Sequence, residues 1–224
     1  MVNWCHNRLA VLGPQDPLER FCSLAQAGRQ PLSLARLVAQ PPDLDRRETV
    51  PHAVVRNAIA QGATEAEQVW RQLDERCAEQ AVRAALSQDA VALLERLGVS
   101  VPDERLGREA WRQRHWGTER DVVFDAAELE MVIGLDPDER PEVRSGSLLR
   151  VDDCAVYSFY SAWTPPAAAI RRAAERHPRL RFALRFAEPG TGIAGELRLC
   201  GAEGLDEECE LAVEDVLPPE ERWA

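Results

Sequence analysis

The chain has 224 residues, with 27 basic and 38 acidic side chains, a net charge of −11 and 45% hydrophobic residues. This length holds one large domain or two small ones with a sizeable core, and the composition is that of an ordinary globular protein. No apolar run approaches the roughly 20 residues that span a bilayer, and the opening MVNWCHNRL lacks the features of a secretory signal. We therefore expect a cytoplasmic protein without membrane association.

The charge is unevenly distributed along the chain. Residues 202–224 carry nine acids and one arginine, a net charge of −8, which leaves only −3 for the other 201 residues. Every basic residue is arginine, so Schiff-base chemistry on lysine and a phosphate-loop lysine are both excluded. An acidic C-terminal tail, residues 211–224, is the expected result.

Six cysteines are scattered without a C-x-x-C pair, at Cys5, Cys22, Cys77, Cys154, Cys200 and Cys209. In a reducing compartment such residues behave as small buried hydrophobes. The adjacent pair Cys5-His6 does not have metal-ligand spacing. We predict six free thiols, no metal site and no cofactor.

The first 49 residues have the pattern of a strand, a helix and a second strand. Residues 7–13 alternate as a strand, and Asp16-Pro17 has the form of a helix start that runs to a stop at Gly28. The leucines between Leu32 and Val38, closed by two prolines, indicate the second strand.

Residues 50–109 differ in character from the flanking sequence. Thr64-x-x-Glu67 is a capping box, and apolar residues follow it at helical spacing. A second helical segment at 90–97 ends at Gly98. We interpret 50–109 as an inserted helical hairpin.

The second half, 110–210, has further strands and one helix. A helix carrying Trp111 and His115 at i, i+4 breaks at Trp116-Gly117-Thr118. The apolar run 122–124 and alternating residues at 129–133 indicate strands before an exposed loop at 135–146. Residues 156–160 form a strand, Thr164 caps a helix that Pro178 ends, and 180–186 form the next strand. After a glycine-rich turn, Leu197 and Leu199 mark the last strand.

Together these patterns predict an α+β fold: an antiparallel sheet with helices on one face, built from 1–49 and 110–210 around the inserted hairpin.

Three separated motifs resemble the YubB-type family. They are M-x-N-W-C-x-N-x-L-x-V-x-G-P at the start, W-R-x-x-x-W-G-T-x-x-D in the centre, and A-W-x-P-P followed by E-P-G-x-x-x-x-G. The matching positions are Asn3, Trp4, Cys5, Asn7, Gly13, Pro14, Trp111, Arg112, Trp116, Gly117, Thr118, Asp121, Ala162, Trp163, Pro165, Pro166, Pro178, Glu188, Gly190 and Gly195. The chain departs from the family pattern at Glu119 and Arg120, where a basic residue and an aromatic are usual. The resemblance implies a ferredoxin-like β-α-β-β-α-β topology on a protein of plasmids, phages or integrated islands, with no established activity and no iron–sulfur cluster.

The residues singled out as a candidate site are Trp116, Gly117, Thr118, Trp163, Pro165, Glu188 and Gly190. Each tryptophan precedes a chain reversal. The indoles either fill the core or wall a pocket with Thr118 and Glu188 as polar contacts. Glu188 before Pro-Gly favours a carboxylate that accepts loop N–H groups over a general base. We predict that the two turns lie close together at one end of the sheet, with Glu188 nearby.

No catalytic grouping is evident. Gly190-x-Gly192-x-x-Gly195 resembles a dinucleotide fingerprint, but no helix signal follows it, so dinucleotide binding is rejected. The four histidines share no motif, and His177 is interpreted as favouring a helix dipole.

A basic face is expected from Arg171, Arg172, Arg176, Arg179, Arg181 and Arg185. It is either a solvated surface or an anion- or nucleic-acid-binding surface. The acidic tail either folds back on this face or mimics nucleic acid toward a basic partner.

We therefore expect a non-enzymatic accessory protein of a mobile element that acts by protein–protein contact, host-defence modulation being one such role. The alternatives are a nucleic-acid-binding protein that uses the basic face, and a small-molecule-binding or enzymatic domain with a tryptophan-walled pocket. Self-association stays open.

Overall fold

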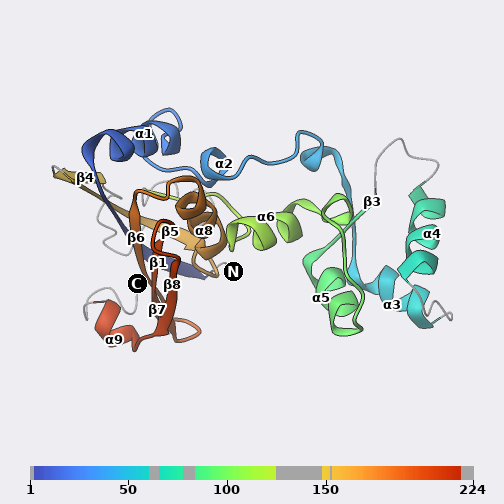
Figure 1. The fold of residues 1–224 in the computed structure, drawn as a ribbon. Coiled ribbons are helices and arrows are strands. Elements are labelled where there is room, and N and C mark those ends of the chain that lie inside the picture. Colours follow the sequence, from blue (N-terminus) through green and yellow to red (C-terminus); the bar gives the residue numbers. More distant parts are fainter. Residues whose placement is uncertain (1–2, 61–65, 78–83, 125–147, 152, 218–224) are drawn as a thin grey trace, which may run out of the picture. The chain divides into compact units, whose positions relative to one another are not determined.

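The computed structural model describes residues 3–60, 66–77, 84–124, 148–151 and 153–217 (Figure 1). The chain divides into two compact units. The first combines Met1–Ala39 with Trp116–Ala224, and the second is Gln40–His115. Within the described residues, no helix is long and apolar enough to cross a membrane.

The first unit is built on an antiparallel sheet with the strand order β4-β5-β1-β6-β7-β8. The strands are β1 (Trp4–Leu12), β4 (Leu148–Val151), β5 (Cys154–Ala162), β6 (Arg181–Glu188), β7 (Ile193–Cys200) and β8 (Leu205–Glu210). Strict alternation of buried and accessible residues along β1 and β5 gives the sheet two different faces.

One face of the sheet forms the core of this unit. It is covered by α1 (Gln15–Ala25) and α8 (Ala167–Arg176). Phe21 of α1 packs edge-on against Tyr157 of β5 and Phe182 of β6, with ring centroids 6.3 and 5.3 Å apart. Ile170 of α8 is fully buried. The prediction of an α+β fold with an antiparallel sheet is confirmed, whereas the prediction of helices on one face only is not, because α9 (Val213–Val216) packs on the other face.

The opposite face is covered at one end, where the short helix α9 (Val213–Val216) packs against Ala187 and Ala194. Along β1, β6 and β7 it presents exposed arginines, among them Arg8 and Arg185. We call this the open face; its residues point away from α1 and α8.

The described sheet has six strands where the expected ferredoxin-like topology has four, so that topology is not confirmed. Leu197 and Leu199 do lie in a strand, but β8 follows it, so the prediction of a last strand there is wrong. The sequence of β8, LDEECE, has poor β-formers and no alternation. It is a strand because its backbone pairs with β7 at the sheet edge, where charged side chains stay solvated.

The predicted second strand at Leu32–Val38 is also wrong, because this segment contains the short helix α2 (Leu34–Leu37). The Asp121 carboxylate accepts hydrogen bonds of 2.6 Å from the Ser33 hydroxyl and from the Leu34 N–H. A partner 87 residues away therefore satisfies the first turn of the helix, which no local pattern reveals.

The second unit is more than a helical hairpin. It contains η1 (Leu44–Arg46), β2 (Glu48–Val50), α3 (His52–Ala60), α4 (Ala66–Cys77), β3 (Ala84–Leu86), α5 (Gln88–Arg96), η2 (Asp103–Arg105) and α6 (Arg108–Trp116), whose last residue belongs to the first unit. β2 and β3 pair in parallel, and Val55, Leu73 and Leu94 are buried. The helices expected after Thr64 and at 90–97 correspond to α4 and α5, but Ala84, expected on the first of them, lies in β3. The two short strands were not expected. The capping threonine, Thr64, lies outside the described residues.

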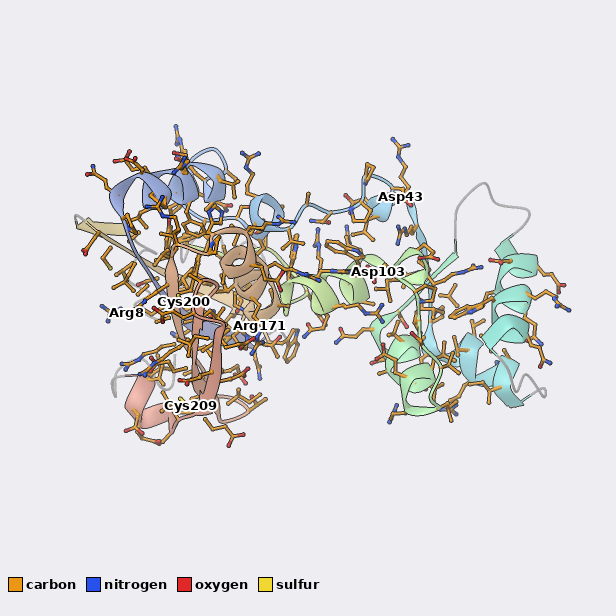
Figure 2. The ribbon with its side chains drawn as sticks, viewed as in Figure 1. Arg8, Asp43, Asp103, Arg171, Cys200 and Cys209 are labelled. Atoms are coloured by element: carbon orange, nitrogen blue, oxygen red, sulfur yellow. The ribbon has the colours of Figure 1, made fainter. Side chains whose placement is uncertain are left out.

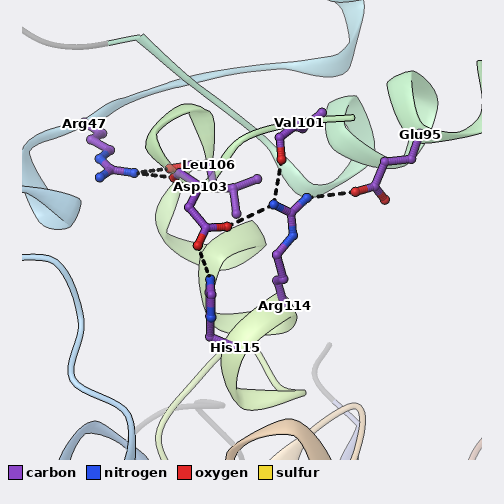
Figure 3. Close-up of polar contacts among 7 residues, drawn as sticks. All are labelled: Arg47, Glu95, Val101, Asp103, Leu106, Arg114 and His115. Carbon is purple, nitrogen blue, oxygen red and sulfur yellow. Dashed lines mark hydrogen bonds and ion pairs between the residues drawn. The ribbon is translucent and has the colours of Figure 1, made fainter. Parts of the chain in front are cut away.

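An ion-pair network centred on Asp103 ties η2 to α6 (Figure 3). The Asp103 carboxylate accepts from Arg114 at 3.0 Å, and its other oxygen lies 2.8 Å from His115 Nε2. Arg114 also donates to Glu95 at 2.8 Å, and Arg47 donates to the Asp103 carbonyl at 3.0 Å. Trp111 stacks on His115 with a centroid distance of 4.4 Å. The spacing of Trp111 and His115 at i, i+4 is therefore explained by packing within this unit.

The strands expected at 129–133 and the loop expected at 135–146 lie outside the described residues. Val123 forms an isolated antiparallel bridge with Tyr160 of β5.

Candidate binding site at the two tryptophan turns

The two tryptophan turns are directly hydrogen-bonded to each other. The Thr118 hydroxyl donates to the Ala162 carbonyl at 2.8 Å, and the Thr164 hydroxyl donates to the Gly117 carbonyl at 2.5 Å. Both turns lie at the end of the sheet where β5 stops and β1 starts. The prediction that they lie close together is confirmed.

The Thr164 hydroxyl does not cap the following helix. α8 begins at Ala167, Pro166 holds the N-cap position, and no side chain caps it. The predicted capping role of Thr164 is wrong because the helix starts later than expected, with Pro166 and not Thr164 directly before its first residue.

Trp116 is a core residue. Its side chain is fully buried, and its indole N–H donates to the Val38 carbonyl at 3.0 Å. Gly117 follows with φ +87°, and a Cβ atom there would lie 2.8 Å from the Pro165 carbonyl oxygen. Only glycine permits this backbone conformation at this approach distance.

Trp163 is the opposite case. Its φ is +65°, which makes it the one non-glycine residue with positive φ in the part of the chain that the structure describes. Its side chain is 37% exposed. A bulky residue in this region is a conformational outlier, and such strain costs on the order of 1–3 kcal/mol.

The backbone on both sides holds Trp163 in this conformation. Its own N–H donates to the Asn3 carbonyl at 2.8 Å, and the N–H of Thr164 donates to the Ala162 carbonyl at 2.8 Å. The Ser161 hydroxyl donates to the Thr164 carbonyl at 2.7 Å. The strained residue is thus fixed by hydrogen bonds to its neighbours in the sheet.

A buried polar chain supports the turn from beneath. The Asn7 amide donates to the Ser161 hydroxyl and to the Cys5 carbonyl, both at 2.8 Å. Asn7 and Ser161 are 4% and 0% exposed. Because a buried polar group without a partner is costly, this chain fixes the position of the Trp163 turn relative to β1.

Glu188 closes the glycine-rich turn after β6. Its carboxylate accepts the Gly190 N–H at 2.8 Å and the Thr191 N–H at 2.7 Å, and it also binds the Thr191 hydroxyl. The predicted role as an acceptor of loop N–H groups is confirmed. A Cβ atom at Gly190 would lie 2.8 Å from the Asn3 amide nitrogen, so Asn3 joins this turn to the Trp163 turn.

The neighbouring titratable groups do not form a reactive centre. Burial raises the pKa of the Cys5 thiol to about 12, so it is protonated at neutral pH. Burial also lowers the pKa of His6, against the opposing effect of Glu188. Both groups are therefore uncharged at neutral pH.

Sequence reasoning missed two residues of this site. Ser161, the link in the buried chain, belongs to no motif, and only its place two residues before Trp163 on a buried strand position could have indicated it. Trp4 lies opposite Ala162, and its buried indole N–H has no hydrogen-bond partner among the described residues.

The six arginines expected to form a basic face are dispersed and mostly bound to acceptors. Arg171 binds Asp206 and Glu208 of β8 (Figure 2). The other pairs join Arg172 to Glu175, Arg181 to Glu203, Arg185 to Glu196, and Arg176 to the Leu37 carbonyl, whereas Arg179 is exposed. The carboxylates that pair with Arg171 and Arg181 belong to residues 203–208, before the predicted tail 211–224. Residues 218–224 lie outside the described residues, so both alternatives for the tail stay predictions.

His177 follows the last residue of α8 and is half-buried. Its pKa is lowered by burial and by the nearby Arg176 and Arg20 guanidinium groups. Its ring packs edge-on against Phe21 at 5.4 Å. The lowered pKa does not favour the positive charge that the predicted helix-dipole role requires, so that role stays a prediction.

Among the described residues, no group of three His, Cys, Asp or Glu side chains has the geometry to hold a metal ion. Cys5, Cys22, Cys154, Cys200 and Cys209 are free thiols. The side chain of Cys77 lies outside the description.

Comparisons with known proteins give no family assignment. No family model matches the sequence, and no curated protein matches it. Among solved structures, protein api92 from Yersinia pseudotuberculosis, of the family DUF1281, aligns with a TM-score of 0.42 and 13% identity, covering 95% of this chain and 99% of that one. A similarity at this level establishes neither family nor function.

Proposed function

We propose that this protein is a non-enzymatic binding protein that acts through contact with another protein, and that Trp163 is its anchor residue. The observation that supports this is the exposed indole at φ +65°. Strain of this kind persists where surrounding structure over-determines a residue, and such positions cluster at binding sites. Tryptophan is also the residue type most enriched among the energetic centres of protein interfaces.

The surrounding groups favour binding over catalysis. Glu188 is occupied by backbone N–H groups, Cys5 is a buried thiol, and Thr118 and Thr164 donate to carbonyls. Each polar side chain next to Trp163 thus supports the backbone. Nucleic-acid binding by the predicted basic face is not favoured, since carboxylates neutralise Arg171, Arg172 and Arg181.

We further propose a ferredoxin-like core formed by β1, α1, β4, β5, α8 and β6, extended by β7 and β8. The adjacent order β4-β5-β1-β6 supports it. The resemblance to YubB-type sequences supports a cytoplasmic accessory role in a mobile element, such as modulation of host defence.

Site-specific photo-crosslinking tests the proposed anchor. A photoreactive phenylalanine analogue replaces Trp163 in one variant and Leu24 in another, since Leu24 is a comparably exposed residue on α1. We expect position 163 to crosslink one specific protein in cells that naturally contain this chain, and position 24 not to. With that protein purified, Trp163→Gly should weaken binding at least about tenfold, as loss of an interface anchor does, and Leu24→Ala should not.

The proposal fails if position 163 gives no specific crosslink, or if Trp163→Gly and Leu24→Ala have equal effects on the dissociation constant. A fold measurement by circular dichroism on each variant separates lost binding from lost structure.

A further inference from the structure

The open face of the sheet carries a second feature that the Trp163 site does not use. Strand register places Arg8 of β1 directly opposite Arg185 of β6. Both side chains stand on the open face, and both are exposed. Like charges directly opposite each other on neighbouring strands destabilise a sheet. A fold that keeps such a pair retains a position suited to an anion.

The charges around the pair do not neutralise it. Glu196 of β7 is 8% exposed in its side chain and is shared by Arg185 at 3.0 Å and Arg198 at 2.6 Å. Glu207 of β8 lies opposite Arg198. Three guanidinium groups therefore face two carboxylates, and Arg8 makes no ion pair within the described part of the chain.

The Glu196 carboxylate already accepts hydrogen bonds from Arg185 and Arg198. Hydrogen bonds from Arg198 and Arg185 lower its pKa, against the opposing effect of burial. It stays ionised and keeps Arg185 in place without being able to compensate Arg8. The excess of one positive charge among the described residues of this face is consequently localised at the Arg8 side of the Arg8–Arg185 pair.

The flanking rows are apolar or aromatic. On one side Tyr160 and His6 lie opposite each other with ring centroids 4.7 Å apart, and on the other Val156 and Ala183 are half-buried next to Ala10. Arginine surrounded by such residues is typical of the centre of a protein interface.

The size of the charge decides the class of ligand. A polyanion such as nucleic acid gains affinity from several neutralised phosphates, whereas the described part of this face has one uncompensated charge. A single carboxylate needs only the one uncompensated charge and accepts two parallel N–H donors from a guanidinium.

We propose that the open face binds an aspartate or glutamate side chain of a protein partner, held between Arg8 and Arg185. This rests on the proposed function only in that the partner is a protein, and it does not involve Trp163.

The test measures binding of a labelled hexaglutamate peptide, acetylated and amidated so that only side chains carry charge. Hexaglutamine and an octauridylate of similar length are the comparison probes. At low ionic strength hexaglutamate should bind, hexaglutamine should not, and octauridylate should bind more weakly. Arg8→Gln should weaken hexaglutamate binding about fivefold, whereas the matched control Arg172→Gln, an exposed arginine on α8, should change it less than about twofold.

A second variant tests the proposal in a way that loss of folding cannot imitate. Arg8→Glu places opposite charges across the strands, so the urea midpoint should rise while hexaglutamate binding disappears. A lower urea midpoint would mean that Arg8 has a structural partner, and would overturn the proposal. Equal peptide binding by the wild type and Arg8→Gln, or tighter binding of octauridylate through Arg8, would also overturn it.

The two proposals fail separately. If hexaglutamate does not bind while position 163 still crosslinks a protein, only the carboxylate site is wrong. If the peptide binds as expected and position 163 gives no crosslink, only the anchor role of Trp163 is wrong.

Discussion

The two tryptophan turns resemble each other in sequence and differ in structure. Trp116-Gly117-Thr118 and Trp163-Thr164-Pro165 each place an indole before a chain reversal, and each turn donates a threonine hydroxyl to the other. Yet Trp116 is fully buried with its N–H bonded to Val38, whereas Trp163 is exposed with φ +65°.

The difference follows from where the glycine stands. In the first turn Gly117 takes the positive φ, which leaves Trp116 in the last turn of α6 and free to enter the core. In the second turn no glycine is available, so Trp163 itself takes the positive φ, and its side chain points out of the core. Whether the tryptophan of a turn is buried or exposed thus depends on which residue of that turn takes the positive φ.

The largest expected effect is on the buried turn. Trp116→Ala should lower the free energy of unfolding by about 3–5 kcal/mol, because it leaves a large cavity and an unpaired Val38 carbonyl. Urea denaturation followed by circular dichroism measures this. A loss below about 1 kcal/mol would place Trp116 outside the core and remove the contrast.

A smaller loss of stability is expected at Glu188, which holds the glycine-rich turn that Asn3 joins to the Trp163 turn. Glu188→Gln replaces a carboxylate that accepts two backbone N–H groups with an amide that accepts through one oxygen, so it should cost about 1–3 kcal/mol. Glu175→Gln on the exposed side of α8 is the control and should be nearly neutral. Equal midpoints for the two variants in urea would contradict the supporting role of Glu188.

Trp163→Gly should change stability by less than about 1 kcal/mol, because relief of a left-handed backbone offsets the side-chain burial that is lost. The same urea titration applies, with Trp116→Gly as the comparison. If the two variants lose similar amounts, Trp163 is a packing residue and the contrast between the turns fails.

The smallest expected effect concerns the reactivity of the buried Cys5 thiol. With a pKa of about 12, Cys5 has a thiolate fraction on the order of one in ten thousand at pH 8, so iodoacetamide should label exposed Cys209 and leave Cys5 unmodified. Peptide mass mapping reads this out. Trp116→Ala should make Cys5 reactive by loosening the core, whereas Trp163→Gly should not; labelling of Cys5 in both variants would contradict the separation of roles.

The sequence was a good guide where periodic burial decides the structure. Alternation along residues 7–13, 156–160 and 180–186 predicts strands that the structure contains as β1, β5 and β6, and the flanking positions of the two turns predict their proximity. Glu188 before Pro-Gly likewise predicts its bonds to the turn.

The sequence was a poor guide where a distant partner decides. Asp121 satisfies the first turn of Leu34–Leu37, and Arg171 and the β7 edge stabilise an acidic segment as a strand. The Thr164 hydroxyl binds the distant Gly117 carbonyl, and α8 starts only after Pro166. The exposure of Trp163 follows from its positive φ, which the residue type alone does not indicate. The pairing of Arg8 with Arg185 needs the strand register, which no single sequence contains.

The hydrogen bond from Trp116 to Val38 also has a consequence for how the protein changes over evolutionary time. It fastens together the residues at which the chain leaves the first unit and re-enters it, 78 positions apart. The entropic cost of closing that loop grows only with the logarithm of its length. Segments of very different size can therefore be gained, exchanged or lost between residues 40 and 115 while the sheet and both tryptophan turns stay as they are.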